Sequence, residues 1–241
     1  MIRKAAIFSK DNNARTRSGV QNLIDEFCKR RILIQLYQNK AGEQTGYSGE
    51  LFQSFSDFKD IAEQPDMVFS VGGDGTFLDT VQKVKNSGVP VAGVNTGRMG
   101  FLANIPGEEI SRSIDLLCRD EFEIIERSLL QITKPSGVLA PESAEALNEV
   151  SIQKSGISMI TINVYVDEVY LNTYWADGLI ISTATGSTAY NLSVGGPILS
   201  PDDESIIISP ISPHNLTIRP IVLSGSSRLR MVMEARSDEF L

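Results

Sequence analysis

Segment 72–76, Gly72-Gly73-Asp74-Gly75-Thr76, holds three glycines and one carboxylate between an apolar run and a helical pattern. Glycines at a strand-to-helix turn let backbone N–H groups approach phosphate oxygens, and the helix N-terminus adds a favourable dipole. A loop that only held phosphate would not place Asp74 among its donors, because two negative charges repel across a few ångströms. The segment therefore predicts phosphoryl chemistry, in which Asp74 acts on a hydroxyl or a metal ion beside the phosphate.

A second glycine-rich segment, residues 177–197, follows an apolar run and is dense in small hydroxyl side chains. Such hydroxyls can bond phosphate or ribose oxygens, and small residues let a flat ring approach the backbone. A loop of turn residues without a ligand is the alternative. Asn148-Glu149 precedes another apolar strand, where an amide and a carboxylate suit ribose hydroxyls or a base edge; a strand-end cap explains the pair equally well.

Alternating strands and helices position the first of these segments. The pattern predicts strands at 5–8, 32–37, 67–71 and 89–94, and helices after a capping box at Ser18 and Gln21, at 57–63, and from the glycine loop to about residue 86. Strands that alternate with helices at this spacing form a parallel sheet covered on both faces. We therefore expect a Rossmann-like α/β domain over residues 1–105.

After a helix near 108–119 the pattern becomes strand after strand, with tight turns. Strands are expected at 128–133, 149–153, 158–166, 169–174, 178–182 and 228–234, and Asp167-Glu168 is expected to turn a hairpin. This pattern is typical of an antiparallel β-sandwich. The expected fold class is thus α/β plus all-β, with the second domain at 106–241.

Composition excludes several other classes. Lys plus Arg number 22 against 30 for Asp plus Glu, a net charge of −8 that argues against general nucleic-acid binding. The two cysteines, Cys28 and Cys118, have no zinc-site spacing and are expected to be reduced. No apolar run approaches the roughly 18 residues of a membrane helix, and the N-terminus has no signal-peptide core. We expect a cytoplasmic protein with no membrane partner.

These segments occur in an order that closely resembles the bacterial NAD kinases, the ATP-NAD kinase family. The glycine loop alone is also shared with lipid kinases and phosphofructokinases. Thr185-Gly186-Ser187-Thr188-Ala189-Tyr190 together with Asn148-Glu149 is specific to the NAD kinases. The further matching segments are Asn95-Thr96-Gly97 with Gly100-Phe101-Leu102, Asp177-Gly178, Gly196-Pro197, Pro213-His214-Asn215-Leu216 and Arg219-Pro220.

The resemblance implies transfer of the ATP γ-phosphoryl group to the 2′-hydroxyl of the adenosine ribose of NAD, with Mg²⁺, in a homo-oligomer (a dimer or a tetramer). It implies that Asp74 is the base that receives the hydroxyl proton. The sequence assigns no metal ligands, and ATP oxygens could supply most of them. The candidate ATP- and NAD-binding residues are Gly72, Gly73, Gly75, Thr76, Asn148, Glu149, Trp175, Asp177, Ala184, Thr185, Thr188, Ala189, Tyr190, Asn191, Leu192 and Ser193.

Two departures from the family pattern stand out. Trp175 lies where the family often has Arg or Lys, so a charge contact is lost or replaced by stacking, unless Trp175 is a core aromatic. Family members usually continue with a further strand and a closing helix after the point where this chain ends, so we expect a fragment. A lipid kinase, a sugar kinase and a catalytically inactive dinucleotide sensor are the alternatives.

Overall fold

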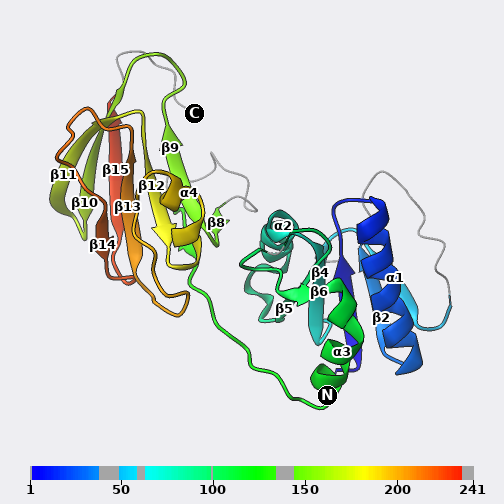
Figure 1. The fold of residues 1–241 in the computed structure, drawn as a ribbon. Coiled ribbons are helices and arrows are strands. Elements are labelled where there is room, and N and C mark those ends of the chain that lie inside the picture. The colour runs from blue at the N-terminus through cyan, green and yellow to red at the C-terminus, as the bar shows by residue number, and fades with distance from the viewer. Residues whose placement is uncertain (1, 38–48, 59–62, 99, 134–143, 235–241) are drawn as a thin grey trace. The chain divides into compact units, whose positions relative to one another are not determined.

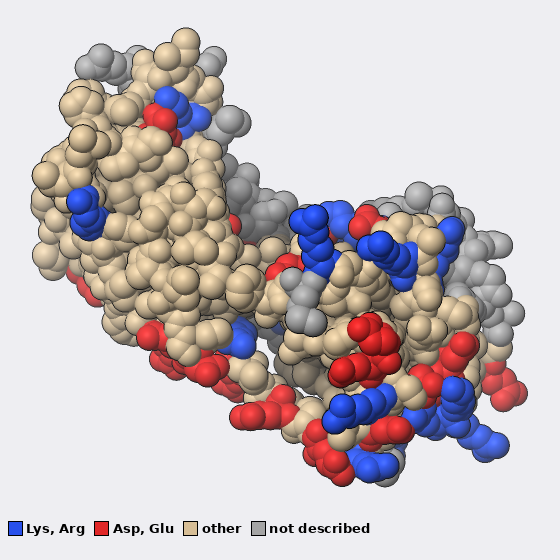
Figure 2. All heavy atoms as spheres, in the orientation of Figure 1, with Lys and Arg blue, Asp and Glu red and all other residues tan. Residues whose placement is uncertain are grey.

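The computed structural model describes residues 2–37, 49–58, 63–98, 100–133 and 144–234. The chain divides into two compact units, Met1–Ile124 and Ile125–Leu241, which we describe separately (Figure 1). In the described residues, no helix is long and apolar enough to cross a membrane. Figure 2 shows Lys, Arg, Asp and Glu mixed over the first unit, and a mostly uncharged visible face on the second.

The first unit is built on a six-stranded sheet in the order β3-β2-β1-β4-β5-β6, in which every pair is parallel. Its strands are β1 (Lys4–Phe8), β2 (Leu33–Tyr37), β3 (Phe52–Phe55), β4 (Met67–Gly72), β5 (Val91–Asn95) and β6 (Ile105–Pro106). Its helices are α1 (Ala14–Lys29), α2 (Asp74–Val84) and α3 (Ile110–Cys118), with the short 3-10 turns η2 (Lys85–Ser87) and η3 (Gly107–Glu109). The strand order reverses between β1 and β4, where ligands of such sheets bind.

Side-chain alternation along β1 explains the two covered faces of this sheet. Ala5 and Ile7 belong to the core that includes residues of α1 and α3, whereas Ala6 and Phe8 belong to the core that includes Val84 of α2. Successive residues of a strand point to opposite faces, so a continuous apolar strand can serve both cores. The predicted Rossmann-like domain is confirmed.

Three details of the first unit differ from expectation. Helix α1 begins at Ala14, because the Asn13 side chain accepts the backbone N–H groups of Arg15 and Thr16, at 3.0 Å each. The prediction that Ser18 and Gln21 form a capping box at the start of this helix was therefore wrong. Strand β3, which is short and half polar, was missed. The helix expected at 57–63 lies largely outside the described residues.

The domain boundary also falls later than expected. β6 pairs with β5 after residue 105, and Ile110, Ile114 and Leu117 of α3 join the core beside α1. The first compact unit therefore extends to Ile124. An apolar helix face needs a partner, and α1 supplies it.

The second unit contains two antiparallel sheets, ordered β14-β13-β12-β9 and β11-β10-β15, and a small β7–β8 pair. Their apolar faces share one core, which includes Ile162, Tyr174, Leu179 and Ile208. This arrangement confirms the predicted sandwich. The strands are β7 (Leu130–Gln131), β8 (Glu145–Ala146), β9 (Glu149–Gln153), β10 (Ile160–Val166), β11 (Val169–Ala176), β12 (Gly178–Thr183), β13 (Ile206–Ile211), β14 (Ile221–Leu223) and β15 (Leu229–Glu234).

The predicted hairpin at Asp167-Glu168 is confirmed. Both residues have positive φ, 48° and 66°, as a two-residue type I′ turn requires. They connect β10 and β11, which pair as antiparallel neighbours. The two cysteines are free and half-buried, as expected.

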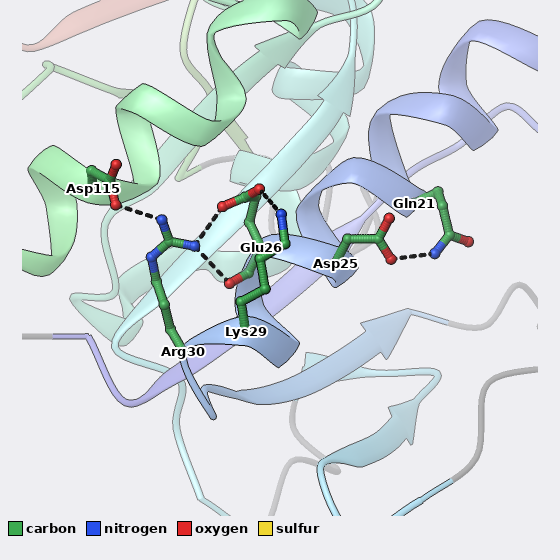
Figure 3. Close-up of polar contacts among 6 residues, drawn as sticks. All are labelled: Gln21, Asp25, Glu26, Lys29, Arg30 and Asp115. Carbon is green, nitrogen blue, oxygen red and sulfur yellow. Dashed lines mark hydrogen bonds and ion pairs between the residues drawn. The ribbon is translucent and has the colours of Figure 1, made fainter.

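Helices α1 and α3 are joined by an ion-pair network (Figure 3). The Glu26 carboxylate accepts from Lys29 at 2.7 Å and from Arg30 at 2.5 Å, and Arg30 also donates to Asp115 at 2.5 Å. The hydrogen bonds from Lys29 and Arg30 lower the pKa of Glu26 to about 2. Glu26 therefore remains charged far below the pH at which an ordinary glutamate is protonated.

We expect Glu26→Gln to lower the melting temperature at pH 7. Because its pKa is lowered in the folded state, ionised Glu26 stabilises the fold at pH values above its ordinary pKa of 4.5. This contribution is lost as the pH falls from 4.5 towards 2. The difference in melting temperature between the variant and the wild type should accordingly decrease between pH 4.5 and pH 2. Asp25→Asn, on the same helix and outside the network, is the control; an equal effect of both variants would contradict the assignment.

Candidate active site

The glycine loop joins β4 to α2, as the sequence predicts. Gly73 is the N-cap of α2, and no side chain caps this helix end. Added Cβ atoms at Gly73 or Gly75 would meet nothing within 4 Å. The loop is therefore open on the side of these residues, and its helix-end N–H groups are suited to an anion.

The Asp74 carboxylate holds the segment that follows β5. Its Oδ2 accepts the backbone N–H of Phe101 at 2.9 Å, and its Oδ1 accepts those of Leu102 and Ala103 at 3.0 and 3.1 Å. Asp74 is the predicted catalytic residue, but the sequence does not predict these contacts. The glycine at position 100 was the one sign in the sequence that the backbone comes close to another group here. In the structure that group is the Asp74 carboxylate, which a Cβ on Gly100 would overlap.

Asn95, the last residue of β5, organises the same segment from within. Its buried Nδ2 donates to the carbonyl oxygens of Arg98 at 2.8 Å and Ala103 at 3.2 Å, and its Oδ1 accepts from Gly97 at 2.7 Å. We name residues 100–103 the amide segment. Its backbone is thus held by one acceptor side chain, Asp74, and one donor side chain, Asn95.

In the second unit, two distant sequence motifs lie against each other. The chain leaves β12 through a 3-10 turn, η5 (Thr185–Thr188), and the short helix α4 (Tyr190–Ser193). A Cβ on Gly186 would overlap the backbone of Asn148, and the Thr183 N–H donates to the Asn148 carbonyl at 2.9 Å. Strand pairing places Glu149 opposite Ser182. Asn148-Glu149 and the 185–190 turn therefore form one local site.

Glu149 is half-buried and its Oε2 is buried without a hydrogen-bond partner among the described residues. Burial raises the pKa of this carboxyl. A buried acceptor left unpaired is unfavourable in the free protein. Such an atom is suited to accept a hydrogen bond from a ligand hydroxyl.

We expect Glu149→Gln to stabilise the free protein at pH 8. A raised pKa stabilises the fold at low pH, and that contribution is lost as the pH rises through the raised value. The variant avoids burying a charge, so at pH 8 its melting temperature should exceed that of the wild type by about 2–4 °C. This shift corresponds to a gain of ~1 kcal/mol in the free energy of unfolding. At pH 4 the two proteins should melt at nearly the same temperature. The exposed Glu121→Gln is the control. A lower melting temperature than wild type at pH 8 would contradict the argument.

Trp175 is not a core aromatic, since 46% of its surface is exposed. Its ring stacks on His214, with centroids 4.4 Å apart and planes at 27°, and the His214 N–H donates to the Trp175 carbonyl at 2.8 Å. His214 therefore supports Trp175. An aromatic ring held at the surface in this way is suited to stacking.

Asp177 forms an ion pair with Lys154, from Nζ to Oδ1 at 2.6 Å, and both side chains are partly exposed. The Lys154 N–H also donates to the Asp177 carbonyl at 2.9 Å. Lys154 was not predicted as a site residue, because only the pairing of β9 with β12 brings it next to Asp177.

Not every predicted binding residue presents its side chain. Thr76 and Ala184 are buried, and Asn191 is fully buried with its amide bonded internally, to the carbonyls of Ser187 and Pro197, both at 3.1 Å, and to the Ser209 hydroxyl at 2.6 Å. The Asn191 side chain therefore supports the turn, and Thr76 is buried in α2 of the first unit. The partly or largely exposed candidates of this segment are Thr185, Thr188, Ala189, Tyr190, Leu192 and Ser193.

Comparison with known proteins agrees with this geometry. Residues 9–122 match the family model of the ATP-NAD kinase N-terminal domain, and residues 147–241 match that of the ATP-NAD kinase C-terminal domain. The NAD kinase of Flavobacterium psychrophilum is 40% identical over 223 residues (92% of this chain, 74% of that protein). The NAD kinase of Christiangramia forsetii is 42% identical over 242 residues (99% and 82%).

Two solved structures are similar to the whole chain. An NAD kinase from Archaeoglobus fulgidus, in complex with ATP, superimposes with a TM-score of 0.73 at 26% identity, covering 99% of this chain and 86% of that one. A yeast NADH kinase complexed with NADH gives a TM-score of 0.83 at 24% identity, covering 95% and 72%, and supports the fold. The resemblance and the fold class expected from the sequence are both confirmed.

Proposed function

The chain belongs to the ATP-NAD kinase family, and we propose that it transfers the γ-phosphoryl group of ATP to the 2′-hydroxyl of the adenosine ribose of NAD, giving NADP. The observation that carries this proposal is a carboxylate, Asp74, at the head of α2 beside open glycines. The same chain presents an unpaired acceptor, Glu149, next to the 185–190 turn.

The first unit supplies the phosphate loop. Phosphoryl transfer has a loose transition state, so positioning and charge stabilisation contribute more than strong base catalysis. The N–H groups at the start of α2, which no side chain caps and which include those of the exposed Gly73 and Gly75, are suited to the phosphate oxygens of ATP. This part of the chain would hold the donor in line with the acceptor oxygen.

Asp74 is proposed as the base. The 2′-oxygen forms a bond to the γ-phosphorus while the bond from that phosphorus to the β,γ-bridging oxygen breaks, and ADP leaves with that electron pair. The 2′-hydroxyl proton passes to the Asp74 carboxylate and then to solvent. Three backbone N–H groups hold this carboxylate in place, which is the support a positioned proton acceptor needs.

The second unit is proposed to recognise the dinucleotide. Glu149 Oε2 would accept a ribose hydroxyl, while Tyr190 and Trp175, both partly exposed, offer ring faces for stacking. Asp177 would bind a polar group of NAD, with Lys154 holding its carboxylate in place. The structural relatives were solved with ATP and with NADH, which supports both classes of ligand for this chain.

Mg²⁺ is proposed to reach the site on the phosphates of ATP. Among the described residues no three His, Cys, Asp or Glu side chains come together as a metal site. Asp74 lies at the phosphate loop but already accepts three backbone N–H groups, so ATP oxygens and water suit most of the coordination sphere. When bound, the ion would neutralise phosphate charge.

We further propose a homo-oligomer, a dimer or a tetramer, located in the cytoplasm. Membership of the family supports this state. Sedimentation equilibrium of the purified chain would test it, and a monomer at micromolar concentration would contradict it.

The function is tested by incubating the chain with NAD, ATP and Mg²⁺ and measuring NADP with an NADP-specific dehydrogenase. We expect NADP to form, and its formation to require all three. Binding of NAD without NADP formation would instead indicate a dinucleotide sensor. Phosphorylation of diacylglycerol in place of NAD would indicate a lipid kinase.

A further inference from the structure

We propose that Gly100 is a positioning residue for phosphoryl transfer, because it allows the amide segment to hold the Asp74 carboxylate in its reactive orientation. This inference rests on the proposed NAD kinase activity. It adds to that activity a second element of the site, residues 100–103, which lie 26–29 positions from Asp74 in the sequence.

The hydrogen bonds limit how the carboxylate can act. A carboxylate offers about four acceptor sites, and three are occupied by the N–H groups of Phe101, Leu102 and Ala103. Oδ1 accepts two of these donors and Oδ2 accepts one, so the remaining site is on Oδ2. The segment therefore fixes the rotation of the side chain and leaves one defined place for a hydroxyl proton.

The backbone of the amide segment can come this close to the Asp74 carboxylate only with glycine at position 100. A Cβ on Gly100 would overlap Oδ1, Cγ and Oδ2 of Asp74 at once. The segment has no room to retreat, because a Cβ on Gly93 of β5 would already meet Ala103 Cα at 2.6 Å and the Leu102 carbonyl at 2.9 Å. The segment is thus packed between a strand of the sheet and the carboxylate.

Asn95 sets the ends of this arrangement. Its side chain donates to the carbonyls of Arg98 and Ala103, on either side of the N–H groups of Phe101 and Leu102 that point towards Asp74. The donors are consequently oriented before any substrate binds. An acceptor oriented in advance is the condition under which a weak base contributes to catalysis.

The test compares Gly100→Ala with Gly97→Ala in the same loop. Gly97 has nothing within 4 Å of an added Cβ, so its variant controls for the loss of glycine flexibility. We expect Gly100→Ala, which keeps the Asp74 carboxylate, to lower kcat about 10²-fold, the scale of a 1 Å misplacement. Gly97→Ala should stay within about threefold of wild type. Equal kcat values for the two variants would overturn the proposal.

A second readout does not depend on activity. In the nucleotide-free wild type, the amide ¹H signals of Phe101, Leu102 and Ala103 should show hydrogen bonding to a carboxylate and slow hydrogen exchange. Both properties should be lost in Gly100→Ala and in Asp74→Ala and kept in Gly97→Ala. Unprotected amides in the wild type would overturn the proposal, even if Gly100→Ala fails to fold.

The two proposals can fail separately. If the wild-type chain forms no NADP, the proposed function is wrong, while the amide signals still decide whether Asp74 holds the segment. If NADP forms and Gly100→Ala retains full kcat, the function stands and the positioning role of Gly100 is wrong.

Discussion

Asp74→Asn is expected to lower the rate of NADP formation by about 10²–10⁴-fold, the range that a positioned general base contributes. The amide side chain has nearly the same size but cannot take the proton of the 2′-hydroxyl. NAD affinity should change little, because Glu149, Asp177 and the 185–190 turn are unaltered. Steady-state kcat together with equilibrium NAD binding measures both effects.

Asp79→Asn is the matched control for this experiment. It makes the same chemical change on the same helix, at a residue paired with Lys10 at 2.8 Å instead of with the amide segment. We expect its kcat to stay close to that of wild type. If Asp74→Asn retained turnover within about threefold, Asp74 would not be the base.

Asp74→Asn also disturbs the amide segment, and the structure shows why. An asparagine oxygen can replace Oδ1 towards Leu102 and Ala103, but its NH₂ group then faces the N–H of Phe101. Part of the rate loss would therefore come from displaced backbone. Gly100→Ala, which leaves the carboxylate present, separates that part from the loss of the base.

Asn191→Ala is expected to destabilise the second unit by about 2–5 kcal/mol. The substitution leaves the carbonyls of Ser187 and Pro197 and the hydroxyl of Ser209 without their partner in a fully buried position. Each buried polar group left unpaired costs about 1–3 kcal/mol, and two of the three, the Ser187 carbonyl and the Ser209 hydroxyl, belong to buried residues. Urea unfolding followed by the far-UV signal of the β-sheets measures the change.

Asn215→Ala is the control, because Asn215 is exposed and its side chain bonds only its neighbour Thr217 among the contacts described here. Its effect should stay below about 1 kcal/mol, as for an exposed turn residue. Equal effects of the two variants would show that the buried network around Asn191 contributes little. In that case the placement of Asn191 as a supporting residue would be wrong.

The pattern of apolar and polar residues along the chain was sufficient to predict most of the strands and helices. The apolar strands of the first unit, most predicted strands of the second and the turn at Asp167-Glu168 follow from neighbouring residues and are observed. The strand expected at 128–133 is reduced to β7, and β13 and β14 were not predicted. The start of α1 was misplaced because two polar residues, Asn13 and Ser18, could both cap a helix, and only Asn13 makes the cap bonds. The short strand β3 was missed because its alternation was too brief to detect.

The residues alone were enough to predict the two glycine-rich segments, the order of alternating and consecutive strands, and the family resemblance that comparison confirmed. Long-range packing was needed to show that Asp74 binds the backbone at 101–103, that Asn148 lies against Gly186, and that Asn191 points inward. These contacts join residues that strand order brings together from distant positions. Local periodicity reports which face a residue occupies, but not which distant backbone will meet it there.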